Sequence, residues 1–75
     1  MRRVGSVERL AQGLAVVRAT DEGYADIGST LVDEELTSVG EVVDVFGPVE
    51  RPYMAVSPAS GVHIPALLGS PLYAR

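Results

Sequence analysis

The sequence predicts a small all-β domain, and three observations support that fold class. Glycine or proline interrupts nearly every window long enough to form three helical turns. Valine, whose branched side chain favours strands, is abundant. Turn-forming residues recur roughly every 8–12 residues, a spacing typical of small sandwiches and barrels. Because 75 residues lie near the lower size limit for an independent core, we expect residues 1–75 to form a single domain.

The first half of the chain predicts three strands. Val4–Leu10 and Leu14–Ala19 are rich in apolar residues and flank Gln12-Gly13, a short turn signal. A second turn is predicted at Asp21-Glu22-Gly23, and the short run Thr30–Val32 forms the third expected strand.

Three more strands are expected in the second half. Val39–Phe46 follows the acidic corner Asp33-Glu34-Glu35 and stops at Gly47-Pro48, since proline cannot continue a paired strand. Tyr53–Ser57 precedes the turn signal Ser60-Gly61, and Pro71–Ala74 is the last expected strand. An open sheet of this size would leave long unpaired edges, whereas closure pairs them. The residues therefore predict a barrel or a sandwich.

Two expected strands carry apolar residues on both faces. In Val39–Phe46, strict alternation would place Val39, Val43 and Val45 on one face and Val42 with Phe46 on the other. Leu14–Val17 is likewise apolar throughout. Either another molecule covers the outer face, or the barrel leaves some valines exposed, as many monomers do. Self-association of the free barrel through these faces is a third outcome.

The charge balance argues against nucleic-acid binding by this chain alone. The formal net charge is −4, and all six basic residues are arginines. Non-specific affinity for nucleic acids comes mainly from cations that neutralise phosphates. A local basic patch formed by Arg2, Arg3 and Arg9 is the alternative. The absence of cysteine, of a signal-peptide pattern and of any long apolar span predicts a cytoplasmic protein without a membrane partner.

Residues for catalysis or metal binding are scarce. His63 is the only histidine, and a zinc site needs several histidine or cysteine ligands. The consecutive carboxylates Asp33, Glu34 and Glu35 are typical of a solvated turn. Nucleophile-elbow, phosphate-loop and dinucleotide patterns do not occur. We therefore predict a non-enzyme that has no catalytic residues, no metal site and no cofactor.

The stretch Val45–Pro58 combines stiffness with exposed apolar residues. Pro48 and Pro52 restrict the backbone around Val49-Glu50-Arg51, and a rigid loop loses less entropy on binding. Tyr53 can supply a large contact area with a polar tip. Two interpretations remain open: a partner-docking surface, or a barrel corner with Phe46 and Tyr53 packed inward.

Several segments resemble one known family. They are Met1–Gly5, Gln12–Arg18, Val39–Val49, Pro52–Val56 with Pro58, and Gly69–Tyr73. Together they are similar to the Gar-type subunit of box H/ACA ribonucleoproteins, over nearly the whole chain. The resemblance implies a closed six-stranded, Greek-key-like barrel that docks on a dyskerin-type pseudouridine synthase.

The resemblance also implies a role in RNA modification. The synthase does the chemistry, while this subunit aids loading and release of substrate RNA in rRNA pseudouridylation and ribosome biogenesis. Guide RNA and substrate rRNA are then contacted indirectly, through the complex. The chain lacks a glycine/arginine-rich tail, which implies the archaeal form. The implied partner-binding residues are Phe46, Gly47, Pro48, Val49, Pro52 and Tyr53.

Within that site, Pro48, Val49, Pro52 and Tyr53 are expected to be exposed, with Phe46 bracing the loop from its base. Two other classes of function compete: a stand-alone barrel that binds nucleic acid, and a barrel that binds a small ligand or supports an enzyme core.

Overall fold

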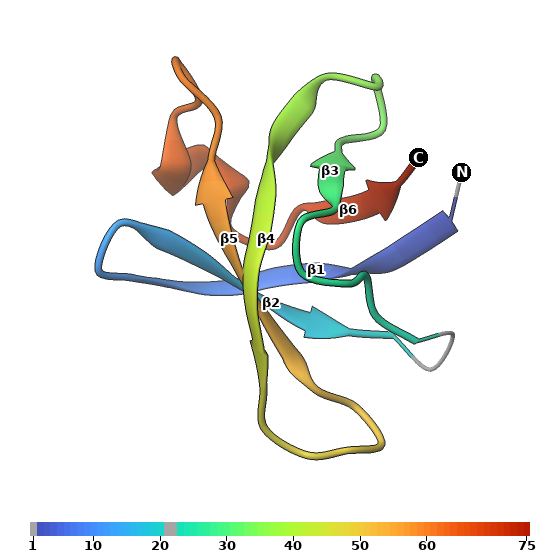
Figure 1. The fold of residues 1–75 in the computed structure, drawn as a ribbon. Helices are drawn as coiled ribbons and strands as arrows, with labels where there is room; N and C mark the ends of the chain where they lie inside the picture. Colours follow the sequence, from blue (N-terminus) through green and yellow to red (C-terminus); the bar gives the residue numbers. More distant parts are fainter. Residues whose placement is uncertain (1, 21–22) are drawn as a thin grey trace.

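The chain forms a closed barrel of six antiparallel strands in the order β1-β2-β5-β4-β3-β6 (Figure 1). The structure is a computed structural model that describes residues 2–20 and 23–75. The elements are β1 (Arg2–Ala11), β2 (Leu14–Ala19), β3 (Thr30–Val32), β4 (Ser38–Phe46), β5 (Tyr53–Pro58), η1 (Ile64–Leu67) and β6 (Pro71–Ala74). Strands β3, β4 and β5 are consecutive neighbours and β6 returns beside β3, which is the Greek-key arrangement. The closed six-stranded barrel is confirmed, and the sandwich alternative is wrong.

Strand positions agree with the sequence prediction to within two residues. Strands β2, β3 and β6 have the predicted bounds, whereas β1, β4 and β5 are longer by one or two residues at an end. Ladder pairs hold these extra residues: Arg2 pairs with Ala74 where β1 meets β6, and Ser38 pairs with Val32 in the β3–β4 hairpin. The pair of Arg2 with Ala74 joins the two ends of the sequence, so it leaves no local sequence signal.

The predicted turns are found wherever the structure describes them. Gln12 and Gly13 have φ of 53° and 78°, the conformation of a two-residue hairpin turn whose twist suits antiparallel strands. At the acidic corner, the Asp33 carboxylate accepts hydrogen bonds from the Glu35 and Thr37 amides, at 2.9 and 3.0 Å. Turns also occur at Gly47-Pro48 and Ser60-Gly61. In the turn predicted at Asp21-Glu22-Gly23, Asp21 and Glu22 lie outside the described residues.

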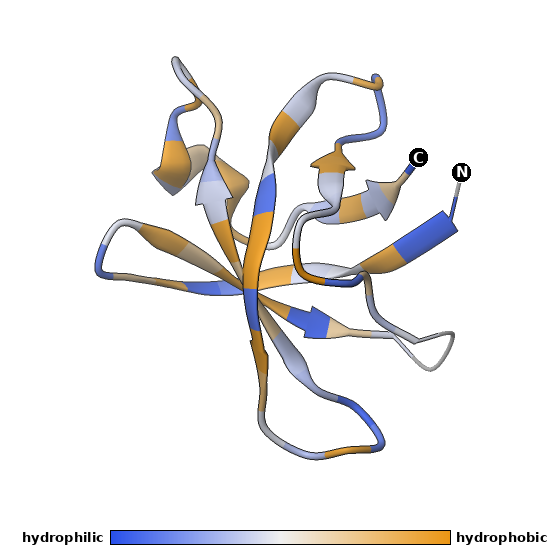
Figure 2. Cartoon of the chain, in the orientation of Figure 1, coloured by the Kyte–Doolittle hydropathy of each residue, from blue (hydrophilic) through white to orange (hydrophobic). Residues whose placement is uncertain are grey.

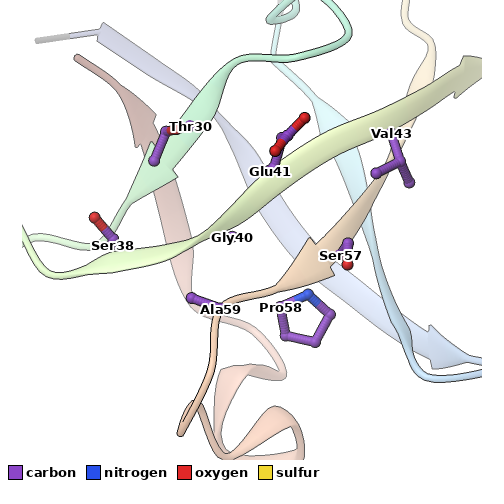
Figure 3. Close-up of a pocket in the computed structure, with 8 residues that line it drawn as sticks. All are labelled: Thr30, Ser38, Gly40, Glu41, Val43, Ser57, Pro58 and Ala59. Atoms are coloured by element: carbon purple, nitrogen blue, oxygen red, sulfur yellow. The ribbon is translucent and has the colours of Figure 1, made fainter.

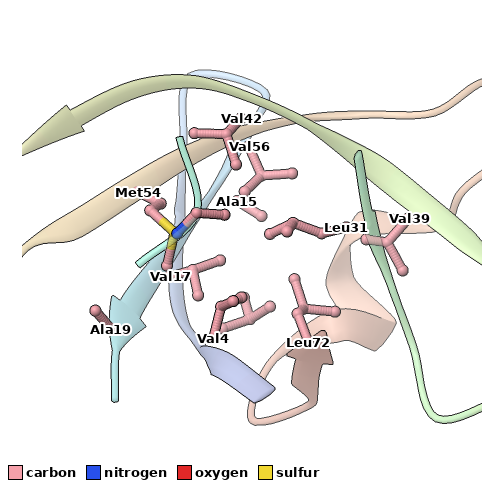
Figure 4. Packing of buried hydrophobic residues seen from close by; sticks show 12 residues of the cluster. Val4, Ala15, Val17, Ala19, Leu31, Val39, Val42, Met54, Val56 and Leu72 are labelled. Carbon is pink, nitrogen blue, oxygen red and sulfur yellow. The ribbon is translucent and has the colours of Figure 1, made fainter. Parts of the chain in front are cut away.

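Aliphatic side chains from all six strands fill the barrel (Figure 4). The largest fully buried ones are Leu31, Met54, Leu72, Val4, Val17, Val32, Val42 and Val56. Among the described residues no polar or charged residue is fully buried. All three tyrosines and the phenylalanine lie at least partly exposed, so aliphatic burial drives folding.

A bulge changes the faces of β4. Val42 pairs with Val56 and Asp44 pairs with Ala55, so Val43 is an additional residue in this strand. Val42 is therefore fully buried, Val43 is 43% exposed, and Val45 packs against the core. The expected grouping of Val39, Val43 and Val45 on one face is wrong, because strict alternation does not survive a bulge. Apolar and polar positions still intermingle along the strands in Figure 2.

One short helix was not anticipated by the sequence. Residues Ile64–Leu67 form the 3-10 helix η1 in a part of the chain where the sequence predicts no strand or helix. One helical turn is too short to show a periodic pattern, although Pro65 suits the start of a helix. Leu67 packs against the core, and His63 is exposed. No helix within the described residues has the length and apolarity needed to cross a membrane.

Candidate functional site

The hairpin formed by β4 and β5 extends beyond the body of the barrel (yellow in Figure 1). Phe46 and Tyr53 are the last residue pair of its ladder, and residues 47–52 form the connecting loop. The stiff stretch singled out in the sequence therefore lies at a protruding end, where a partner can reach it.

Three side chains stack on the outer surface of β4, β5 and β2. The rings of Phe46 and Tyr53 lie 5.6 Å apart, centroid to centroid, with 20° between their planes. The guanidinium carbon of Arg18 lies 4.8 Å from the centre of the Tyr53 ring, and Nη1 of Arg18 donates a 2.9 Å hydrogen bond to the Tyr53 hydroxyl. We call Arg18, Tyr53 and Phe46 the outer stack. The alternative in which Phe46 and Tyr53 pack inward is wrong.

The outer stack also leaves one polar group unsatisfied. Nε of Arg18 is buried and, among the described residues, it has no hydrogen-bond partner. The guanidinium depends on Tyr53 for its hydroxyl contact and for its stacking surface. Tyr53 is consequently half-buried, and its contacts with Arg18 and Phe46 stabilise the fold.

Hydrogen bonds to the end of β2 hold the loop in place. Nε of Arg51 donates to the Ala19 carbonyl at 2.7 Å, and the Ala19 amide donates to the Pro52 carbonyl at 3.0 Å. The second bond continues the pairing of β2 with β5 by one residue beyond Arg18 and Tyr53. Pro52 is buried as a result, so the expectation that it is exposed is wrong.

The tip of the loop is open to solvent. Pro48, Val49 and Glu50 are all exposed, and Val49 is 92% exposed, the highest value for any large apolar residue described. Gly47 has φ of +93°, and a Cβ atom there would lie 3.0 Å from the Tyr53 ring, so glycine suits this position. A rigid base therefore presents an apolar tip.

A hollow of about 180 Å³ lies beside this tip. The residues that line it are Tyr24, Val45, Phe46, Gly47, Pro48, Val49 and Pro52. Tyr24 comes from the segment between β2 and β3 and is 43% exposed. Sequence reasoning did not assign Tyr24 or Arg18 to the site, because both are distant in sequence from the loop; Arg18 was noted only as the end of a family-like segment. The structure brings them to the six predicted partner-binding residues through the barrel topology.

A second hollow, of about 350 Å³, lies on the outside of β3, β4 and β5 (Figure 3). Its lining includes Thr30, Ser38, Ser57 and Glu41. Three hydroxyls and a carboxylate can donate and accept hydrogen bonds, but the carboxylate repels phosphate. This lining gives little support to a nucleic-acid or small-anion site.

Charged groups elsewhere do not assemble into a metal site. No cluster of three or more histidine, aspartate or glutamate side chains able to hold a metal ion occurs in the part of the chain that the structure describes. Asp33, Glu34 and Glu35 line a shallow hollow, but the Asp33 carboxylate is occupied by two backbone amides.

The basic patch considered from the sequence is not gathered in one place. Arg2 and Arg9 lie at opposite ends of β1, roughly 23 Å apart at about 3.3 Å per strand residue. Arg2 and Arg3 pair with Ala74 and Tyr73, so they lie near Arg75. The alternative of one patch formed by Arg2, Arg3 and Arg9 is therefore wrong, because Arg9 lies far from Arg2 along β1.

Comparison with known families identifies a family that this chain matches. The family described as the Gar1/Naf1 RNA binding region matches residues 1–75, the whole sequence. No curated protein matches this chain.

Proposed function

Because the chain belongs to the Gar1/Naf1 RNA-binding family, we propose that it is a non-catalytic protein subunit of a box H/ACA pseudouridylation ribonucleoprotein. In this role it docks on a dyskerin-type pseudouridine synthase and aids loading and release of substrate rRNA. An archaeal, cytoplasmic setting is part of the same proposal. The synthase supplies the catalytic residues, and this chain contributes a surface.

The observation that carries the docking role is the exposed apolar tip on a restrained hairpin. An apolar side chain such as Val49 gains from leaving water, and burial of its surface favours association. The hydrogen bonds donated by Arg51 and Ala19 restrict the conformations of the loop before it binds, which reduces the entropy lost on association. Phe46, partly exposed beside the tip, extends the contact surface.

The test is retention of this protein by immobilised synthase in the absence of RNA. We expect Val49→Ser to weaken binding about fivefold or more, since full burial of a valine side chain contributes about 1.5–3 kcal/mol. Its melting temperature should not change, because Val49 packs against little of the barrel.

A matched control is Leu68→Ser, which removes another exposed apolar side chain from the segment after η1. This variant should bind as the wild type does. Failure of the synthase to retain the wild-type protein would refute the proposed docking role.

Direct RNA contact is the second candidate function, favoured by the family description and by Arg2, Arg3 and Arg75. A net charge of −4 leaves few cations to release counterions, so we expect weak binding of guide RNA by the isolated protein. A gel-shift titration at several salt concentrations measures this affinity. A tight shift that weakens steeply with salt and is lost in Arg2→Ser/Arg3→Ser would favour direct contact instead.

A further inference from the structure

One edge of β4 is paired only in part. At Val42, the amide donates to the Ser29 carbonyl at 2.9 Å and the carbonyl accepts from the Gly28 amide at 2.8 Å. These bonds lie on the side of β4 opposite β5, and they continue the pairing of β3 with β4. On the N-terminal side of Gly28 the chain forms a turn, in which the Ser29 amide donates to the Asp26 carbonyl. The chain segment that covers the edge therefore ends beside Val42.

Beyond the bulge, Val45 is the next residue whose backbone faces this edge. In an antiparallel ladder, alternate residues direct their amide and carbonyl groups away from the paired strand. With Val43 as the additional residue, Val45 takes the same orientation as Val42. The Val45 amide donates to the carboxylate of its neighbour Asp44 at 2.9 Å, a side chain in place of a strand. In the described residues no group donates to the Val45 carbonyl from this side.

The hollow beside Val45 has the size for one side chain. Its volume of about 180 Å³ is below the range of roughly 300–1,000 Å³ that holds drug-sized ligands. Tyr24 and Phe46 give it aromatic walls, and Val49 stands at its rim. An unpaired strand edge with an adjacent apolar hollow is the combination that proteins use to bind extended peptides by strand addition.

The carboxylates near the open edge of β4 favour a partner segment that carries a basic side chain. The exposed Asp44 lies at the open edge, and the exposed Asp26 and Glu50 lie in the two neighbouring loops. No arginine lines the hollow, as far as the structure describes it. A basic side chain on the incoming segment therefore meets carboxylates. A second copy of this chain is disfavoured, since edge-to-edge pairing would bring two Asp44 side chains together.

We propose that the open edge of β4 at Asp44–Phe46 accepts an extended segment of the partner protein, which adds a strand beside β4. The segment places one apolar side chain in the hollow and a basic side chain against Asp44. This inference rests on the proposed docking function, and it specifies how the same hairpin recognises its partner.

The experiment combines two measurements on the complex with recombinant synthase. In the first, amide hydrogen exchange of wild-type protein is followed by NMR, free and bound. We expect exchange at Val45 to slow at least about tenfold on binding, because a strand then covers the edge.

The second measurement is the affinity of Val45→Pro. Proline removes the amide that faces the edge but no ladder bond to β5, so the hairpin should stay folded while affinity falls about tenfold or more. The matched control is Glu34→Pro, at the second position of the turn closed by the Leu36 amide and the Asp33 carbonyl, where proline is favoured. This control should bind normally.

The outcomes separate the two proposals. If the synthase does not retain the wild-type protein, both the docking function and strand addition are wrong. If the wild type binds but exchange at Val45 is unchanged, strand addition alone is wrong, whether or not Val45→Pro folds. A dimer of the free protein that Val45→Pro dissolves in sedimentation experiments would overturn the assignment of the edge to a different protein.

Discussion

Removing the Tyr53 hydroxyl tests the physical role of the outer stack. Tyr53→Phe keeps the ring contacts with Phe46 and Arg18 but deletes the acceptor of the 2.9 Å hydrogen bond from Arg18. Hydrogen bonds between uncharged groups contribute about 0.5–1.5 kcal/mol net and those to charged groups somewhat more, while partial exposure of this pair reduces its value. We therefore expect the free energy of unfolding to fall by about 1 kcal/mol, and the melting temperature by roughly 4–8 °C.

Tyr53→Ala removes more. It deletes the ring that packs against Phe46, a pair contributing about 0.5–1.5 kcal/mol, together with the cation–π contact to Arg18, which adds about 0.5–1 kcal/mol. With the hydrogen bond, the loss is about 2–4 kcal/mol. A 75-residue domain has a total stability of about 4–11 kcal/mol, at roughly 0.05–0.15 kcal/mol per residue. The variant should remain folded at room temperature unless total stability lies at the low end.

Urea unfolding of a double-mutant cycle measures the interaction. The cycle comprises wild type, Tyr53→Phe, Arg18→Met and the double variant; methionine retains much of the aliphatic stem of Arg18. We expect a coupling energy of about 0.5–1.5 kcal/mol between the two positions. A coupling of zero, with Tyr53→Phe as stable as wild type, would show that the hydrogen bond contributes nothing.

The contacts of the outer stack also revise an expectation from the sequence. The sequence predicts that Tyr53 belongs to the exposed docking surface and that Phe46 braces the loop from its base. In the structure the rings of Tyr53 and Phe46 stack on each other, and Tyr53 also accepts a hydrogen bond from Arg18. A change in partner binding by Tyr53→Ala must therefore be compared with the change in stability of the same variant. Val49 is the better probe of docking, because it is almost fully exposed.

Three further outcomes are expected. Gly40→Ala should lower stability by about 1–3 kcal/mol in urea unfolding, because a Cβ atom there would collide with the Ser57 carbonyl oxygen and the Val56 side chain; Thr30→Ala, at an exposed neighbouring position, should change it little. Leu36→Gly should raise the free energy of unfolding by up to about 1 kcal/mol, and with it the melting temperature, since Leu36 has φ of +66° and is exposed. Leu36→Ala keeps a side chain at this unfavourable φ and should not raise either quantity. Added salt should raise the melting temperature by screening Asp33, Glu34 and Glu35 from one another, and a flat or falling value from low to moderate ionic strength would contradict this.

Much of the fold could be predicted because its determinants are local. Turn residues such as Gln12-Gly13 and Gly47-Pro48 mark where strands end, and the apolar runs between them mark the strands. Closure followed from the cost of unpaired edges in so small a sheet. The bulge at Val43 could not be predicted, since a bulge depends on pairing with Ala55 and Val56 across the hairpin.

The site could be predicted only in outline. The prolines and Val49 located the exposed loop, but burial of Pro52 depends on a hydrogen bond from Ala19, far away in the sequence. Arg18 and Tyr24 are distant in sequence from the loop and reach the site through strand order. The open edge at Val45 likewise exists only because the segment before β3 joins β4 at Gly28 and Ser29, after the turn that begins at Asp26.

The pairing of β1 with β6 has a consequence for how the protein folds. Arg2 lies opposite Ala74, so the ring of strands closes between the two ends of the sequence. Two further pairings, β2 with β5 and β3 with β6, also join distant residues, a topology that slows folding to roughly milliseconds to seconds in small β proteins. During synthesis, β1 must wait for β6 to emerge before its outer edge is paired. Until that moment the nascent chain exposes a strand edge, and rapid completion of the last strand protects it from aggregation.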